Sequence, residues 1–512
     1  MTISHINSIV IQGLEGATID IEVDLGLGLP SFTIVGLPDK AVEEAKERVR
    51  SALKNSHMQF PQHRITVNLA PADVKKIGTG FDLPIALGIL ASMEEIDPNS
   101  FSKSIVIGEL SLSGSTRKVS GIFPAAMHAK EMGFTKIFLP SENAKEAALI
   151  DGIDIYPVDC LRSLYLHFRD EKPITKALAT NWQEKFERVQ PQVDMGTVRG
   201  QNQAKRALEI AASGGHNLIM SGPPGSGKTL LAKAFSGILP TLSKKEIFEV
   251  TKIYSVAGLL DSENPIVVQR PFRSPHHTSS TISLIGGGQT PRPGEISLAH
   301  RGVLFLDEFP EFTRSTLESL RQPLEDGVVT ISRASGSMHL PAKFILLATK
   351  NPCPCGYLYD NLKHCKCSPN EIKKYQHRLS GPLMDRIDLH ITVPRVEISE
   401  LSAANNTENT ADIKDRVEKA RAIQLLRFEK TKIVSNAEMG VKDIDAYCKI
   451  DNASRQLLDS AVNRFALSAR AYHRILKVAR TIADLASCES IDSNHIAESL
   501  QYREDSLEDQ MM

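Results

Sequence analysis

Eight residues near the middle of the chain have the types and spacing needed to hold the phosphates of a nucleotide. Gly222–Thr229 read G-P-P-G-S-G-K-T, after an apolar strand-like segment and before a helical one. Glycines let backbone N–H groups curl around phosphate oxygens, and the helix N-terminus adds the positive end of its dipole. Lys228 would contact the β- and γ-phosphates, and Thr229 would offer its hydroxyl to Mg²⁺. The residues predicted to bind ATP are Gly222, Pro223, Pro224, Gly225, Ser226, Gly227, Lys228, Thr229 and Leu230.

Two further apolar segments end in polar side chains that suit the same chemistry. Val303–Glu308 read V-L-F-L-D-E, a buried strand followed by two carboxylates. Ligands of open α/β sheets bind beyond the carboxyl ends of the strands, so Asp307 is expected to hold Mg²⁺ and Glu308 to polarise the attacking water. The segment Phe344–Ala348 leads to Asn351. An amide there would orient the water or the γ-phosphate, although an Asn before a proline is also a common turn former.

Four of the seven cysteines lie close together in the sequence. They form two C-x-C pairs, Cys353 with Cys355 and Cys365 with Cys367, joined by a short loop that ends in His364. Four soft thiolates suit tetrahedral Zn²⁺, with His364 as a spare ligand, so we predict a structural zinc site. Free thiols are the alternative, and a disulfide is disfavoured in a chain without an export signal. The other three cysteines are scattered and are expected to lie in cores.

An α/β fold must position these groups, and the hydropathy pattern divides it into several parts. Residues 1–170 alternate Ile/Val-rich strand segments with short helices. Residues 171–195 are charged and proline-containing, which predicts a linker that packs partly through Trp182. Residues 196–395 form the phosphate-binding α/β unit, with a stretch too rich in Gly and Pro for regular structure at residues 285–295. Residues 396–512 begin with a polar loop and continue as helices.

Composition limits the classes of function. The 512 residues include 60 Lys and Arg against 61 Asp and Glu, which gives a net charge of −1. This balance disfavours a uniformly basic surface, but it allows a local basic patch. The sequence shows neither a secretory signal nor an apolar run long enough to cross a membrane. We therefore expect a cytoplasmic protein with no membrane partner.

The three strand-end motifs, in this order, resemble the AAA+ ATPases. Gly222–Thr229 match the Walker A motif, Val303–Glu308 the Walker B motif, and Asn351 the sensor-1 position. Four further phrases resemble the magnesium-chelatase-like ATPases of the ComM/YifB type: F-R-S-P-H-H-T-S-S, P-R-P-G-E-I-S-L-A-H-R-G, N-P-C-P-C-G and S-G-P-L-M-D-R-I-D-L-H. The resemblance covers essentially the whole chain. It implies a central AAA+ domain with a parallel sheet and a C-terminal helical lid.

The same resemblance implies roles for residues outside the strand ends. AAA+ proteins form rings, so a homo-oligomer, specifically a hexamer, is expected. Arg386 matches the arginine finger that reaches a neighbour's γ-phosphate, whereas an ion pair with Asp385 or Asp388 is its structural alternative. Arg470 matches the sensor-2 arginine, with Arg474 on the same helix face as the other candidate.

A hairpin between Val328 and Phe344 is expected to project toward the ring pore. Its Arg333 and Lys343 would then meet phosphates of single-stranded or branched DNA. Ordinary surface loops are the alternative interpretation.

The N-terminal segment between residues 65 and 140 resembles the proteolytic domain of Lon-type proteases. That chemistry needs a serine activated by a lysine. Here the serine position falls on Gly78, next to Thr79, and the lysine position on Phe123. Peptide cleavage by that mechanism is therefore expected to be absent, although Thr79 and Lys118 lie near these positions. We expect the fold to serve as an assembly or substrate-binding platform.

The predicted function is a ring ATPase that couples hydrolysis of ATP to movement on DNA. By resemblance to ComM-type proteins, this movement would be helicase activity or branch migration in recombination or natural transformation. The alternatives are a magnesium-chelatase-type motor subunit and a protein-remodelling ATPase that acts on a protein partner.

Overall fold

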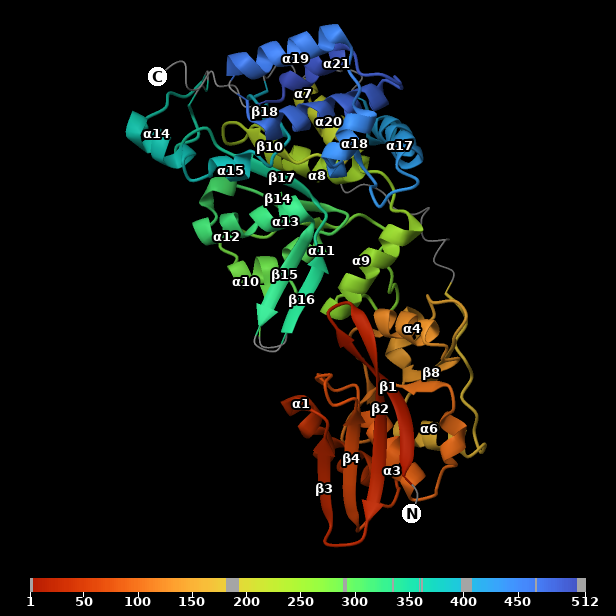
Figure 1. Cartoon of the computed structure of the whole chain (residues 1–512). Coiled ribbons are helices and arrows are strands. Elements are labelled where there is room, and N and C mark those ends of the chain that lie inside the picture. Colours follow the sequence, from red (N-terminus) through yellow and green to blue (C-terminus); the bar gives the residue numbers. More distant parts are fainter. Residues whose placement is uncertain are drawn as a thin grey trace. The chain divides into compact units, whose positions relative to one another are not determined.

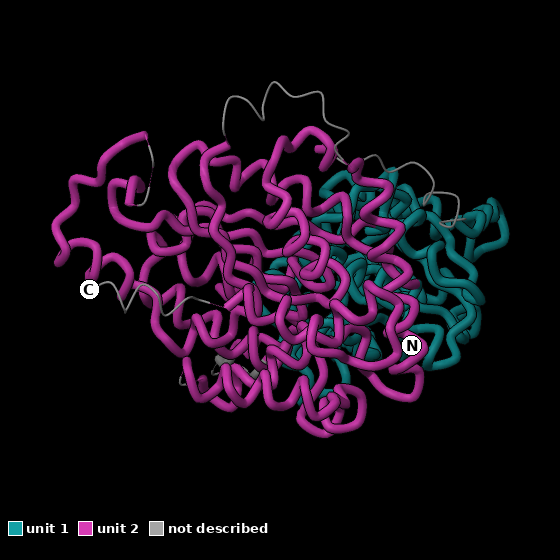
Figure 2. Tube along the Cα trace, turned by 90° about the horizontal axis from the view of Figure 1, so that it is seen from above, with its two compact units in different colours: residues 1–187, 244–268 teal, residues 188–243, 269–512 magenta. Residues whose placement is uncertain are grey.

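The computed structural model describes residues 3–180, 193–288, 292–333, 336–358, 360, 362–396, 408–465 and 467–503. The chain forms two compact units, and both are discontinuous in sequence (Figures 1 and 2). One comprises Met1–Glu187 with Lys244–Val268, and the other Arg188–Ser243 with Gln269–Met512. The predicted linker residue Trp182, most of the polar loop at residues 402–411 and the end of the C-terminal tail lie outside the described residues.

The N-terminal unit is built on a seven-stranded mixed sheet, which confirms the expected α/β class. The first two strands form an antiparallel hairpin, β4 pairs antiparallel with β2, and the remaining pairs are parallel. Along β4, alternate residues are buried because successive side chains point to opposite faces of a strand. In sheet order the strands are β3 (Ser31–Val35), β4 (Arg64–Ala70), β2 (Glu15–Gly26), β1 (Ser4–Gln12), β5 (Ser104–Val106), β8 (Lys136–Pro140) and β9 (Asp154–Val158).

Short helices surround this sheet. The most apolar of them is α3, in which every residue is buried. Its Asp82 is held by Arg48, whose Nε lies 2.6 Å from the carboxylate, so the buried charge has a partner. The helices are α1 (Lys40–Glu43), α2 (Ala45–Asn55), α3 (Asp82–Ser92), α4 (Ile122–Glu131), α5 (Ala144–Ala147) and α6 (Leu161–Phe168), with the small hairpin β6 (Glu109–Leu110) and β7 (Thr116–Arg117).

One segment from the phosphate-binding region packs in the N-terminal unit. It is Lys244–Val268, which begins with helix α9 (Lys244–Ala257). The Ser255 carbonyl accepts a hydrogen bond from Gly121 N–H at 3.0 Å, and the Ser255 hydroxyl donates to buried Glu146 at 2.6 Å. The sequence pattern does not show that this segment belongs to the N-terminal unit, because its partners lie more than a hundred residues away in the chain.

The second unit contains a five-stranded parallel sheet, as predicted for the phosphate-binding region. All four neighbouring pairs run parallel. The inner strands are short and mostly buried, and β14 is buried throughout, as is typical of a sheet covered on both faces. Its order is β11 (Phe272–Arg273), β14 (Val303–Leu306), β17 (Ile345–Lys350), β10 (Leu218–Ser221) and β18 (Leu389–Thr392).

Helices complete this unit, and the C-terminal region is helical as expected. Its last helices enclose an apolar core of their own, and α17 and α20 also pack on α7. In sequence order the helices are α7 (Asn202–Gly214), α8 (Lys228–Ile238), α10 (Thr281–Ile285), α11 (Glu295–Leu298), α12 (Arg314–Ser319), α13 (Arg321–Asp326), α14 (Pro369–Gln376), α15 (Gly381–Met384), α17 (Thr410–Arg427), α18 (Val441–Tyr447), α19 (Asn452–Phe465), α20 (Ala469–Leu485) and α21 (Ser493–Leu500). Within the described residues, no helix is both long and apolar enough to cross a bilayer.

The Gly/Pro-rich stretch at residues 285–295 was expected to lack regular structure, and that expectation is wrong in part. Gly286–Gly287 (β12) and Arg292–Pro293 (β13) form a short antiparallel pair. Glycine makes this possible, because a Cβ on Gly286 would lie 2.4 Å from the Arg292 carbonyl oxygen. The predicted hairpin is present as β15 (Val328–Arg333) and β16 (Gly336–Pro341).

Candidate nucleotide site and cysteine cluster

The predicted phosphate loop joins β10 to α8 at the carboxyl edge of the parallel sheet. Gly225 and Gly227 have φ values of +77° and +91°, in the left-handed region that glycine adopts readily. A Cβ on either residue would meet no atom within 4 Å. Glycine is therefore required at these two positions by the backbone conformation and not by a lack of space. Gly222 is different: a Cβ there would lie 2.2 Å from the Val393 carbonyl oxygen. The loop can therefore offer its N–H groups to phosphate oxygens.

Lys228 begins α8 and is buried. Its Nζ donates to the carbonyl oxygens of Gly222 at 2.7 Å and Pro223 at 2.9 Å, and it lies 3.4 Å from Asn351 Oδ1. Burial lowers the pKa of Lys228 to about 8, although nearby Asp307 acts in the opposite direction. The ammonium is thus poorly solvated, and a phosphate would supply the negative charge that favours its protonated form.

The side chains predicted to hold Mg²⁺ meet beside the phosphate loop. Thr229 Oγ1 donates to Asp307 Oδ2 at 3.1 Å, and Thr349 Oγ1 donates to the other carboxylate oxygen. A hydroxyl and a carboxylate are the hard oxygen ligands that Mg²⁺ prefers, and it keeps several waters besides. The residues present therefore fit the ion. Thr349 was not singled out from the sequence, although it lies at the end of the strand that pairs with β14.

Glu308 follows β14 in an unusual backbone conformation. Its φ is +52°, which is uncommon for a non-glycine residue and is often found at functional sites. Its N–H donates to Thr349 Oγ1 at 2.9 Å, which helps hold that conformation. The carboxylate is half exposed and lies 3.6 Å from His277 Nδ1. His277 had no predicted role. It follows β11, which pairs with β14, so its place beyond a neighbouring strand could have indicated a residue close to Glu308.

The two arginines predicted to serve the ring interface and sensor 2 share one carboxylate. Glu325, at the end of α13, pairs with Arg386 and also with Arg470, whose Nη2 lies 2.6 Å away. Arg386 also donates to the Pro382 carbonyl oxygen at 2.6 Å. An ion pair of Arg386 with Asp385 or Asp388 was the alternative to the finger role. In the structure its partner is instead Glu325, which was not predicted.

Arg474, the other sensor-2 candidate, has a structural partner. It lies 3.0 Å from buried Asp388, which also contacts His216 at 3.3 Å. Burial alone would raise the pKa of Asp388, but Arg474 and His216 hold that pKa well below its usual value. Since Arg474 balances a buried charge, the half-exposed Arg470 is the freer of the two to contact a nucleotide.

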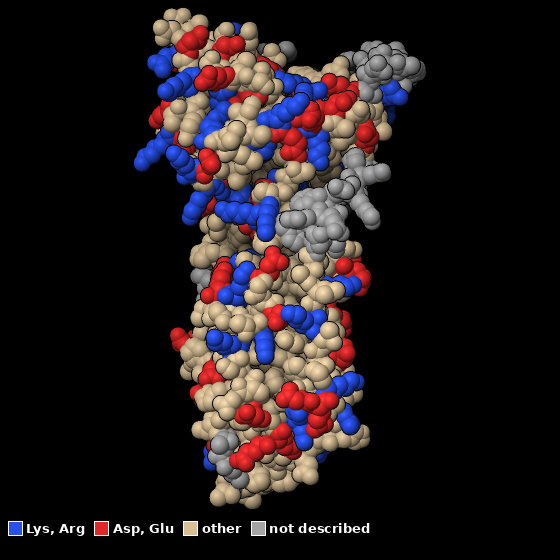
Figure 3. Space-filling model, turned by 90° about the vertical axis from the view of Figure 1, so that its right-hand side faces the viewer, with Lys and Arg blue, Asp and Glu red and all other residues tan. Residues whose placement is uncertain are grey.

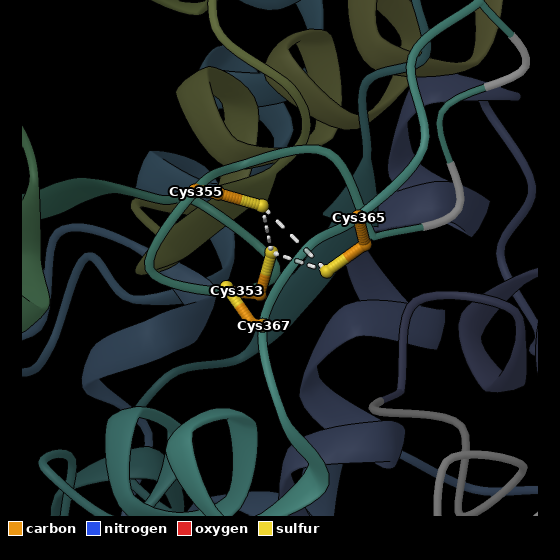
Figure 4. A group of neighbouring side chains, drawn as sticks. All are labelled: Cys353, Cys355, Cys365 and Cys367. Atoms are coloured by element: carbon orange, nitrogen blue, oxygen red, sulfur yellow. Dashed lines mark hydrogen bonds between the residues drawn. The ribbon is translucent and has the colours of Figure 1, made fainter.

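The four predicted cysteine ligands converge on one point, as Figure 4 shows. All four Sγ atoms lie within 4.8 Å of one another. Cys353 is buried, and its Sγ lies 3.4 Å from that of Cys355 and 3.6 Å from that of Cys365. The structure confirms that the two C-x-C pairs meet, and this donor set suits a tetrahedral soft metal ion.

Comparisons with known proteins agree with this arrangement. Models of magnesium chelatase subunit ChlI match residues 194–401 and 21–143, and a model of the ChlI C-terminal region matches residues 407–503. The competence protein ComM of Haemophilus influenzae is 43% identical, with 98% of each chain covered. The uncharacterized protein YifB of Escherichia coli is 40% identical, covering 98% of this chain and 97% of its own. The chain belongs to the ComM/YifB-type magnesium-chelatase-like proteins.

A relative from the chelatases themselves covers much less of this ComM/YifB-type chain. The magnesium-chelatase 67 kDa subunit of Heliobacterium mobile is 26% identical, over 39% of this chain and 30% of its own. The parallel sheet and phosphate loop fit the magnesium-chelatase AAA+ domain, which also implies ATP and Mg²⁺ as ligands.

The two predicted DNA contacts lie on or beside the hairpin of this ComM/YifB-type chain. Arg333 is the last residue of β15, and its side chain lies outside the described part of the structure. Lys343 follows β16 and forms an ion pair with Glu438, which Arg301 also contacts at 3.2 Å. Lys343 is therefore already engaged within the unit.

The positions that resemble a protease site have other partners in this ComM/YifB-type chain. Phe123 is buried, and its ring meets Phe248 of α9 edge-on, with 5.3 Å between ring centroids. Thr79 donates to Glu109, and Lys118 donates to the Leu260 carbonyl oxygen at 2.9 Å. Phe123 and Lys118 thus contact the segment Lys244–Val268, and Thr79 is bound to Glu109.

Proposed function

We propose that this protein is a ring-forming ATPase that couples ATP hydrolysis to movement on DNA. The observation that carries the ATPase part is the meeting of Lys228, Thr229, Asp307, Glu308 and Asn351 beyond the ends of three adjacent strands. A strand edge with this set of groups has what phosphoryl transfer to water requires: a cation for the phosphates, ligands for Mg²⁺ and a carboxylate near the attacking water.

Each residue has a distinct part in the proposed reaction. Lys228 exchanges its carbonyl partners for phosphate oxygens, while the loop N–H groups hold the β-phosphate. Thr229 and Asp307 hold Mg²⁺, which when bound offsets charge on the phosphates. Glu308 accepts a hydrogen bond from the attacking water and turns it toward the γ-phosphate. Asn351, already within reach of Lys228, orients the γ-phosphate or the water.

The active assembly is proposed to be a homohexamer. Arg386 would act on the nucleotide of a neighbouring subunit, and Arg470 would contact nucleotide phosphate as the sensor-2 arginine. A cation at the γ-phosphate stabilises charge in the transition state and makes hydrolysis depend on assembly. The shared carboxylate of Glu325 keeps the two arginines together before they meet a nucleotide.

DNA is the proposed substrate for two reasons. The near full-length similarity extends to a competence protein, whereas the chelatase subunit is matched over a minor part of its length. The hairpin β15–β16 also carries Arg333, which we retain as the contact to phosphates because Lys343 is held by Glu438. A neutral chain is compatible with this role, since basic and acidic side chains are intermixed over the face drawn in Figure 3 and binding needs only a local patch.

The N-terminal unit is proposed to be a platform without peptidase activity. Gly78 and Phe123 stand where the Lon-type mechanism needs a nucleophile and a base, and Phe123 is buried against α9. The alternatives for the whole protein are a chelatase-type motor subunit and a protein-remodelling ATPase.

The decisive experiment combines ATPase and strand-displacement measurements. We expect single-stranded or branched DNA to stimulate hydrolysis, and the purified protein to separate a labelled Holliday junction in the presence of ATP. Glu308→Gln should bind nucleotide normally but lose hydrolysis and displacement. An ATPase rate that DNA leaves unchanged, with no displacement, would refute the DNA motor, and cleavage of casein would refute the inactive platform.

A further inference from the structure

We propose that the four-cysteine cluster binds one Zn²⁺ and that this ion holds Asn351 against the phosphate loop, so that zinc occupancy sets the affinity for ATP. The inference rests on the proposed nucleotide site and adds a metal-dependent control to it.

The sulfur–sulfur distances suit a metal ion better than other states of the cysteines. Four thiolates around Zn²⁺ at Zn–S distances of about 2.3 Å lie about 3.8 Å apart along the edges of a tetrahedron. The separations from Cys353 to Cys355, Cys353 to Cys365 and Cys355 to Cys365 are 3.4, 3.6 and 3.6 Å. A disulfide would need about 2.05 Å, and the cysteines are free thiols in the structure.

Direct contacts link the cluster to the phosphate loop. Asn351 precedes the first ligand by only two residues, and its Oδ1 lies 3.4 Å from Lys228 Nζ. Gly356 follows the second ligand with φ of +80°, and a Cβ there would lie 2.6 Å from Pro224 Cδ. The turn that carries Cys353 and Cys355 therefore packs against the loop predicted to hold the phosphates.

The second C-x-C pair is also linked to the nucleotide site, through helix α14. Ser368, directly after Cys367, caps α14 through a hydrogen bond from Glu371 N–H. The same helix carries Tyr375, whose burial raises its pKa, and the nearby Asn351 backbone N–H opposes that rise. Asn351 therefore lies close to elements that begin at both ends of the cysteine loop, and one ion that joins the two C-x-C pairs would set its position.

The first test measures metal and nucleotide binding on the full chain. We expect elemental analysis to find one zinc per chain, and Cys365→Ser to reduce it strongly. The same variant should bind a fluorescent ATP analogue about tenfold more weakly, the size of losing one hydrogen bond to a charged group. The matched control is Cys488→Ser, an exposed cysteine outside the cluster, which should change neither quantity.

The second test separates metal binding from its effect on ATP and does not remove a ligand. Gly356→Ala should keep its zinc but weaken the ATP analogue, because the added methyl group displaces Pro224. Gly133→Ala is the matched control, since Gly133 has a similar φ of +83° and a Cβ there meets nothing within 4 Å.

Several results would overturn the inference. A chain with no zinc, or with iron in its place, would refute the assignment of the ion. Nucleotide affinity that stays at the wild-type value both in Cys365→Ser without zinc and in Gly356→Ala would refute the coupling. Failure of the wild-type chain to bind any nucleotide would instead refute the proposed function, and the zinc content would still report on the ion.

Discussion

The depressed pKa of Lys228 predicts that ATP affinity falls as pH rises above neutrality. In the nucleotide-free protein burial lowers this pKa to about 8, and the ammonium has loop carbonyls as its partners. Bound phosphate favours the protonated lysine and so raises its pKa. Because the bound pKa is higher than the free one, the electrostatic part of binding is complete below pH 8 and is lost as pH rises through that value.

The magnitude follows from the free pKa. With a pKa of about 8, Lys228 is about nine-tenths protonated at pH 7 and about one-tenth protonated at pH 9. The affinity for ATP should therefore fall roughly tenfold between these values, provided that the bound pKa lies above 9. Lysine at its ordinary pKa near 10.4 would stay charged and show almost no change over this range.

The assay is titration of a fluorescent ATP analogue from pH 7 to 9 at constant ionic strength. Lys228→Arg is the informative comparison, because guanidinium remains charged throughout and should flatten the profile. Lys228→Met should bind weakly at every pH. A flat wild-type profile, or the same slope in Lys228→Arg, would show that the buried lysine is not the titrating group.

Three other predictions concern the two units and Glu308. Asp484→Asn should lower the free energy of unfolding by about 3–5 kcal/mol in thermal or urea denaturation, because this wholly buried carboxylate balances two arginines; Asp459→Asn, at an exposed site, should have no effect. Phe123→Ala should destabilise the N-terminal unit by about 3–5 kcal/mol, and a smaller loss would show that α9 does not pack tightly on it. His277→Ala should lower kcat without changing nucleotide affinity, because it removes the neighbour of the Walker B glutamate; an equal effect from His276→Ala would refute that reason.

The sequence was most informative where function depends on consecutive residues. The phosphate loop is local, since its glycine conformations and the start of α8 are encoded within Gly222–Thr229. The two C-x-C pairs were likewise readable because their spacing is short. The parallel sheet followed from apolar segments of strand length, and its order places their ends together. The predicted roles of Asn351, Arg386 and Arg470 came from resemblance and stay proposals.

Features that depend on distant contacts were not readable in this way. The segment after Ser243 has the same helical pattern whichever unit it packs on, and only its partners near Gly121 and Glu146 decide the matter. Glu325 is one of many glutamates on helices, and its significance comes from Arg386 and Arg470, far along the chain. Periodicity predicts which face of an element is buried, but not which element covers it.

The shared carboxylate of Glu325 also bears on how a ring would assemble. Glu325 is about half exposed, with a side-chain exposure of 46%, and the hydrogen bond from Arg386 lowers its pKa. The Arg386 side chain is only 10% exposed, so separating it from Glu325 costs more than the about 0–1 kcal/mol of an exposed ion pair but less than the about 3–5 kcal/mol of a fully buried one. An arginine at the transferring phosphoryl group is worth about 10³–10⁵ in rate, or about 4–7 kcal/mol. If Arg386 has the proposed role, exchanging Glu325 for a neighbour's nucleotide is favourable in the transition state of hydrolysis, and Glu325 can hold Arg386 in an isolated subunit without preventing that role.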